Sequence, residues 1–277
     1  MIRQDLTRSF TGIVDVDPLA RAAASASTPY GLPCATAWDP PANILALQPD
    51  EVHVWRADLN QSGLTARDID RILSQEERER AARFYLKRDR DHFTAGRAML
   101  RVILGRYLDT DPGQLQFSRG PHGKPALASE RGADALCFNV AHSHDIALYA
   151  VARGRDVGVD VELVRADVEV DLIAEQFFST REIAALRLLP QERKTTAFFT
   201  CWVRKEAFLK ARGDGLATEL ASFSVSISPD EPAALLEVRD HPEEALAWSL
   251  RQLDLAPSYA AALAVHAGEC RVRCWRW

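Results

Sequence analysis

The sequence lacks the marks of a membrane-spanning or secreted protein. No stretch of its 277 residues is apolar for long enough to span a bilayer, and the polar segment from Met1 to Phe10 has no signal-peptide core. Its five cysteines are odd in number and scattered, with no CxxC pair, which is typical of reduced thiols rather than of a disulfide framework. We therefore expect a cytoplasmic protein with no membrane partner.

The sequence also lacks an excess of positive charge. A net charge of −5 argues against a broad nucleic-acid interface. Apolar residues make up 47% of the chain, which is enough for the core of one large domain or of two ordinary ones.

The segment 157–162 predicts a strand with one buried face. Three valines alternate there with Gly158, Asp160 and Glu162. Both carboxylates lie on one face, where like charges repel and burial increases the cost. A divalent cation relieves both costs, and oxygen ligands suit Mg²⁺. The alternative is that the two acids only coat the solvent face of an edge strand, so the rest of the chain has to decide.

Two capping boxes predict two helix pairs. Ser74 with Glu77 begins a helix to about Tyr85, and Ser179 with Glu182 begins another that ends before Pro190. A long helix is expected after each, at 92–108 and 195–211. Gly and Pro predict a loop at 119–125. Strands are expected at 51–57, 115–117, 136–141, 146–151 and 260–265.

A shift of 105 positions brings the first helix pair onto the second, placing Phe93 on Phe198 and Arg101 on Glu206. We therefore predict an α+β fold of two similar halves in one chain, related by a pseudo-twofold, with a cleft between them. The expected domains are an N-terminal extension at 1–49, partly irregular with helical composition only at 19–24, a first half at 50–156 and a second half at 157–277.

The second long helix carries Glu206 and Lys210 four residues apart on one face. They could be a plain surface pair worth about 0.3–0.5 kcal/mol. If this helix packs beside the strand at 157–162, however, Glu206 could join the two strand acids around a cation. Mg²⁺ usually binds one or two carboxylates together with waters and substrate phosphates, so a phosphorylated ligand is expected with it.

Several basic or polar residues are candidates for binding that phosphate. They are Lys124, His142 with Ser143, Lys210 and the arginines of the 78–90 segment. Taken singly, each has an ordinary alternative: His142 as a structural histidine, and the arginines as a solvated helix face. Trp202 is expected in the core rather than against a ligand.

Together, four separated motifs resemble the 4′-phosphopantetheinyl transferases of the surfactin-synthetase-activating (Sfp) type. The resemblance covers roughly residues 50–265. The motifs are Gly123-Lys124-Pro125, Phe138-Asn139-Val140-Ala141-His142-Ser143, Gly158-Val159-Asp160-Val161-Glu162 and Trp202-x-x-Lys205-Glu206-Ala207-x-x-Lys210. There are two departures: Ala141 stands where the family commonly has serine, and Arg80 stands where it often has lysine.

The resemblance implies transfer of 4′-phosphopantetheine from coenzyme A to a serine of an apo acyl, peptidyl or polyketide carrier domain, including those of secondary metabolite biosynthesis. With it we expect Mg²⁺, or Mn²⁺ in its place, on Asp160, Glu162 and Glu206. The candidate base is Glu206, acting directly or through a metal-bound water, and Lys210 would stabilise the leaving phosphate. The residues that the resemblance implies for coenzyme A are Arg80, His122, Gly123, Lys124, Pro125, His142, Ser143, Lys205 and Lys210.

Two other functions stay open on the sequence alone. One is a non-catalytic protein that keeps this fold and binds carrier domains. The other is a Mg²⁺-dependent hydrolase that acts on coenzyme A without a carrier. Because two joined halves could complete the site in one chain, we expect a monomer.

Overall fold

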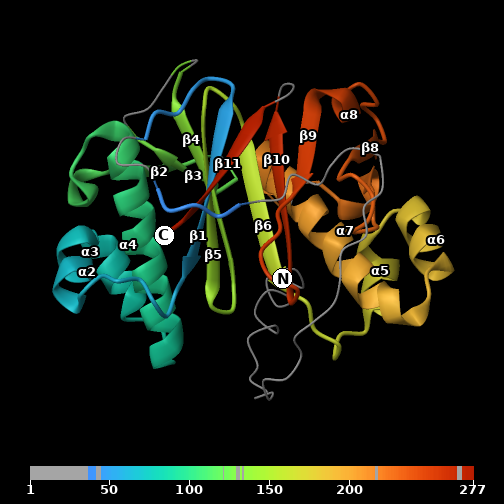
Figure 1. Cartoon of the computed structure of the whole chain (residues 1–277), viewed down its shortest axis with the longest axis horizontal. Helices are drawn as coiled ribbons and strands as arrows, with labels where there is room; N and C mark the ends of the chain where they lie inside the picture. Colours follow the sequence, from blue (N-terminus) through green and yellow to red (C-terminus); the bar gives the residue numbers. More distant parts are fainter. Residues whose placement is uncertain are drawn as a thin grey trace. The chain divides into compact units, whose positions relative to one another are not determined.

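The two larger β-sheets lie between two groups of helices, α2 (Ala66–Ile72) to α4 (Lys87–Leu108) on one flank and α5 (Val170–Phe177) to α7 (Gln191–Arg212) on the other (Figure 1). The computed structural model describes residues 37–41, 45–120, 122–128, 132, 134–215, 218–266 and 270–277. All of these belong to the compact unit Pro33–Trp277. The helical segment expected at 19–24 lies outside the described residues.

The first sheet has the strand order β11-β1-β5-β4. Its strands are β1 (Glu51–Asp58), β4 (Leu136–Ser143), β5 (Ile146–Arg153) and β11 (Arg271–Arg276). β5 runs antiparallel to β1 and β4, whereas β11 runs parallel to β1. The last strand of the chain therefore belongs to the sheet built mainly by the first half.

The second sheet has the order β6-β10-β9, with β6 (Val157–Leu163) antiparallel to β10 (Tyr259–His266) and β10 antiparallel to β9 (Trp248–Gln252). The three valines of β6 face the first sheet and share a buried core with Val54 and Leu148. The alternating valines are therefore the buried face of β6, and Asp160 and Glu162 lie on its opposite face.

One long helix covers the outer side of each sheet. Met99 and Leu104 of α4 (Lys87–Leu108) pack on Trp55 and Tyr149 of the first sheet. α7 (Gln191–Arg212) approaches the second sheet so closely that a Cβ at Gly158 would meet the Ala207 carbonyl oxygen at 2.2 Å. Only glycine allows this contact between strand and helix.

The two halves repeat one buried ion pair. Glu77 caps α3 (Gln75–Ala81) and accepts from Arg101 of α4 at 2.7 Å, while Glu182 caps α6 (Thr180–Leu188) and accepts from Lys205 of α7 at 2.7 Å. The counterpart of Arg101 is therefore Lys205 and not Glu206. The two capping serines, Ser74 and Ser179, are 105 positions apart, whereas the bounds of α4 and α7 are 104 positions apart. The equivalence between the two long helices is therefore one residue shorter than the shift expected from the caps.

Several expected boundaries move. The helix expected to reach about Tyr85 ends at Ala81, and the strand expected at 115–117 lies at 117–119. The charged segment 87–91, expected as a break, is the first turn of α4. α7 begins at Gln191, and β4 continues through His142 and Ser143. The remaining elements are short: α2 (Ala66–Ile72), α5 (Val170–Phe177), α8 (Glu244–Ala247), β2 (Phe117–Arg119), β3 (Pro125–Leu127), β7 (Phe223–Val225), β8 (Leu235–Val238), η1 (Pro112–Gln114) and η3 (Leu220–Ser222).

Candidate active site

Asp160 and Lys210 meet where β6 packs against α7. Two residues beyond Gly158, the Asp160 carboxylate turns toward the helix and is only 4% exposed. Lys210 Nζ donates to Asp160 Oδ1 at 2.5 Å. The close contact at Gly158 thus brings a strand carboxylate and a helix ammonium together.

Two further carboxylates lie near this pair. Glu206 is one helical turn before Lys210, and its charge raises the pKa of both Asp160 and Glu162. Glu162 is half-buried, and Ser143 Oγ donates to its Oε2 at 2.9 Å. The three acids predicted as a set therefore act on one another electrostatically.

Burial governs the ionisation of this cluster. Burial, with the Glu206 charge, raises the pKa of Asp160 to about 6 although Lys210 opposes the shift. Burial and then the Asp160 charge raise the pKa of Glu162 to about 8. Burial alone would lower the pKa of Lys210, but the neighbouring carboxylates outweigh it and raise that pKa. The protein therefore places three carboxyl groups beside one lysine ammonium, and their proximity opposes ionisation of Asp160 and Glu162.

The donors suit a hard divalent cation. Asp160 Oδ2 is buried and has no hydrogen-bond partner among the described atoms. Carboxylate oxygens such as those of Asp160, Glu162 and Glu206 are the metal ligands that a hard divalent cation prefers. No three acidic, histidine or cysteine side chains in the described part of the chain stand close enough to form a closed metal-binding set. The residues thus have the chemistry that Mg²⁺ requires, and their arrangement around a cation is a proposal taken up below.

The Gly-Lys-Pro loop lies against the C-terminal end of α7. Lys124 Nζ donates to the carbonyl oxygens of Ala211 at 2.8 Å and Val157 at 3.2 Å. Gly215, with a φ of 59°, packs so near His122 that an added Cβ would lie 3.3 Å from the His122 Cβ. Lys124 therefore joins this loop to both elements of the acidic cluster, which the sequence did not reveal.

The other predicted ligand contacts are spread over the first half. Arg80 is exposed on α3, with its guanidinium 5.1 Å from the centre of the Phe93 ring. His142 is exposed on β4, and partial desolvation, followed by the Lys210 charge, lowers its pKa. His122, Gly123 and Pro125 are exposed in the loop.

Lys205 requires a correction. Its side chain has no exposure, and its ammonium donates to both Glu182 carboxylate oxygens and to the Phe223 carbonyl, at 2.6–2.8 Å. All three N–H groups are occupied, so Lys205 is a structural cation and cannot reach coenzyme A. Trp202 is 7% exposed and packs against Phe178 and Phe198, which confirms its expected place in the core.

Ala141 lies in the core between the two sheets and is 3% exposed. It shares a face of β4 with Asn139 and Ser143, whose hydroxyl lies two residues further along. The departure from the family pattern thus falls at a buried position.

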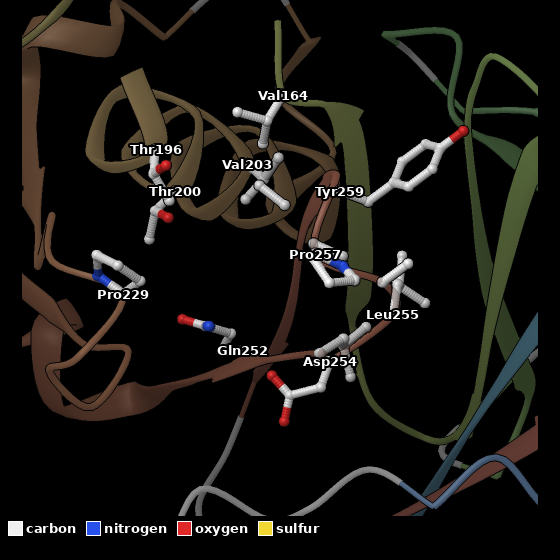
Figure 2. A pocket seen from close by; sticks show the side chains of 14 residues that line it. Val164, Thr196, Thr200, Val203, Pro229, Gln252, Asp254, Leu255, Pro257 and Tyr259 are labelled. Carbon is white, nitrogen blue, oxygen red and sulfur yellow. The ribbon is translucent and has the colours of Figure 1, made fainter. Parts of the chain in front are cut away.

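A separate cavity of about 390 Å³ lies on the N-terminal half of α7. Figure 2 shows Thr196 and Thr200 on one side of it and Pro229 and Gln252 on the other. Its lining does not include any of the three acids or Lys210. Arg204, which is fully buried, donates to Gln252 Oε1 at 2.8 Å and so fixes one wall.

Comparison with known proteins identifies the family. Residues 156–264 match the family model of the 4′-phosphopantetheinyl transferase superfamily, and residues 60–153 match that of the 4′-phosphopantetheinyl transferase N-terminal region. The chain is 40% identical over 240 residues to the 4′-phosphopantetheinyl transferase HetI of Nostoc sp., covering 87% of this chain and 98% of that protein. It belongs to the 4′-phosphopantetheinyl transferase superfamily.

A second relative agrees with this assignment. The 4′-phosphopantetheinyl transferase Sfp of Bacillus subtilis is 28% identical over 192 residues, covering 69% of this chain and 81% of that protein. The resemblance inferred from the four motifs is thus confirmed, as is the α+β fold with two halves, since the two family models fall on successive halves. Among the described helices, none is both long and apolar enough to cross a membrane.

Proposed function

We propose that this chain transfers the 4′-phosphopantetheine group of coenzyme A to a serine of an apo acyl, peptidyl or polyketide carrier domain. The serine oxygen bonds to the phosphorus that carries pantetheine, and the bond from that phosphorus to the bridging oxygen breaks. Adenosine 3′,5′-bisphosphate leaves, and the serine proton passes to a base. The observation that carries this proposal is the buried acidic cluster with Lys210, in a chain of this superfamily.

We also propose that Asp160, Glu162 and Glu206 hold Mg²⁺, or Mn²⁺ in its place. The bound cation would supply charge neutralisation at the pyrophosphate of coenzyme A. The unpartnered Asp160 Oδ2 supports this assignment, as do the Glu206 charge, which raises the pKa of Asp160 and of Glu162, and the Asp160 charge, which raises the pKa of Glu162.

The remaining steps belong to side chains of the chain itself. Glu206, half-buried one turn from Lys210, would accept the serine proton on a carboxylate oxygen. Lys210, whose pKa is raised, stays an ammonium and would donate to the leaving phosphate. The third N–H of Lys124, together with Arg80, His142 and the backbone of residues 122–125, would hold the other phosphates of coenzyme A.

The test is intact-mass spectrometry of a purified apo carrier domain incubated with this chain, coenzyme A and Mg²⁺. We expect one phosphopantetheine to be added, and neither a chelator control nor the Glu206→Gln variant should give the product at a comparable rate. Glu192→Gln is the matched control, because Glu192 is exposed on the same helix. Bound coenzyme A with no transfer to any carrier would favour the non-catalytic alternative, and adenosine bisphosphate release without a carrier would favour the hydrolase.

We further propose that the protein acts as a cytoplasmic monomer, with carrier domains as its partners rather than nucleic acid or membrane. The net charge of −5 supports the first exclusion. Support for a monomer comes from Ser143 and Glu162, which bring both halves of one chain to the same site. Size-exclusion chromatography with light scattering would measure the oligomeric state directly.

A further inference from the structure

β4 and β6 come from different halves of the chain and lie next to each other. β4 ends the first sheet and β6 begins the second, and no backbone ladder joins these two fully described strands. The edge amides of β6 that face β4 therefore need partners of another kind.

Two side chains of β4 supply those partners. Asn139 Oδ1 accepts from the Val159 amide at 2.9 Å, and Ser143 Oγ accepts from the Leu163 amide at 3.1 Å. Asn139 and Ser143 are four residues apart on β4, and their partners Val159 and Leu163 are four residues apart in the same direction on β6. The two side chains therefore take the place of the backbone hydrogen bonds that would join two parallel strands. They fix the register of one half against the other.

Ser143 does more than Asn139. A hydroxyl has one proton to donate, and because the Leu163 amide already occupies its oxygen as a donor, that proton is free for Glu162 Oε2 at 2.9 Å. Ser143 is only 8% exposed, which holds this geometry away from solvent. Glu162 has three rotatable bonds, and this contact anchors one of its two oxygens.

We infer that Ser143 is a positioning residue that aims Glu162 at the cation, and that it acts across the junction of the two halves. This inference rests on the proposed cation site. It replaces the expectation that the Ser143 side chain binds coenzyme A, because its single hydroxyl proton is donated to Glu162 and cannot also be donated to a phosphate. Partners that orient a metal ligand are commonly worth 10–100-fold in metal affinity.

The experiment measures Mn²⁺ binding to the full chain by electron paramagnetic resonance of the free ion. Coenzyme A is present and the carrier is omitted, so no turnover occurs. We expect Ser143→Ala to weaken Mn²⁺ binding by about 10–100-fold and Ser143→Thr, which keeps a hydroxyl, to restore it. Asn139→Ala is the matched control: it breaks the other junction contact without touching a carboxylate, so it should lower the melting temperature and leave Mn²⁺ affinity unchanged.

Wild-type Mn²⁺ affinity in a folded Ser143→Ala chain would overturn the inference. So would equal losses in Ser143→Ala and Asn139→Ala, because a merely structural junction predicts equal effects. If Asn139→Ala does not fold, failure of Ser143→Thr to restore Mn²⁺ binding would overturn it instead. A wild-type chain that binds no Mn²⁺ removes both the cation site and this inference, while the carrier mass assay still decides the transferase activity separately.

Discussion

Lys124 illustrates how one side chain can serve structure and ligand together. Its ammonium donates to the carbonyl oxygens of Ala211, near the C-terminal end of α7, and of Val157, the first residue of β6, and burial lowers its pKa. We expect Lys124→Met to lower the free energy of unfolding by about 1–3 kcal/mol, because two charge-assisted hydrogen bonds are lost. Urea denaturation measures this, with the exposed Lys87→Met as control.

The same variant tests the phosphate role. If the third N–H of Lys124 binds coenzyme A, calorimetry on folded Lys124→Met should show weaker binding. Unchanged affinity would mean that the lysine of the Gly-Lys-Pro motif is structural.

His53 gives the chain a pH-dependent stability away from the acidic cluster. Tyr107 accepts from Trp55 Nε1 at 2.9 Å, so its own proton goes to His53 Nδ1 at 2.7 Å. Burial lowers the pKa of His53 to about 4, although Glu51 opposes the shift. Since the unfolded chain takes up this proton near pH 6.5, stability is complete above that pH and is lost as the pH falls toward 4.

Between pH 6.5 and pH 4, we expect protonation of this histidine in the unfolded chain to lower the free energy of unfolding by up to about 3 kcal/mol. Urea denaturation at a series of pH values measures the loss. His53→Asn keeps an acceptor for Tyr107 and has no imidazole to protonate, so its stability should fall less on acidification. An identical pH profile in both proteins would contradict the assignment.

At the residue scale, sequence alone could name the acids and Lys210 but could not tell Lys205 from Lys210. Both lysines belong to one motif, yet five residues turn a helix by about 140° beyond a full revolution. One side chain therefore faces β6 and the other faces Glu182. Which face is covered depends on tertiary packing, and no local pattern carries that information.

At the scale of elements, aromatic rings hold α7 to its neighbours. The Trp202 ring meets the Phe177 ring of α5 edge-on at 5.9 Å, and the Phe198 ring of α7 stacks on Phe178, just beyond α5, at 5.2 Å. We expect Trp202→Ala to cost about 3–5 kcal/mol of stability, because it leaves a large cavity in this cluster. Thermal unfolding measures the loss, and Leu188→Ala, 86% exposed on α6, should change little. A stable but inactive Trp202→Ala chain would instead indicate a ligand contact.

Element type was predictable where patterning is strong, as for β1, β6, α6 and β10. Element ends were less so. The charged turn at 87–91 resembles a break because the first turn of α4 is mostly solvent-exposed and carries no apolar periodicity. α2 was missed although Thr65 and Asp68 form a capping box, a signal present in the sequence.

At the scale of the whole molecule, the two halves are not independent. β11 returns from the end of the chain to pair with β1, and Trp275 packs there on Trp55 and His53. No sequence pattern identified this strand, because parallel pairing over more than 200 positions leaves no local trace. The internal repeat did predict two halves, but not that one would complete the sheet of the other.

This arrangement predicts how the molecule unfolds. Because the two sheets share one buried core, the described unit should unfold in a single transition, with circular dichroism and tryptophan fluorescence coinciding in urea. Deleting residues 271–277 removes Trp275 from the core and leaves β1 as an open edge. We expect that deletion to lower the unfolding midpoint of both halves together. A wild-type midpoint after deletion, or two separate transitions in the full chain, would show that the halves fold independently.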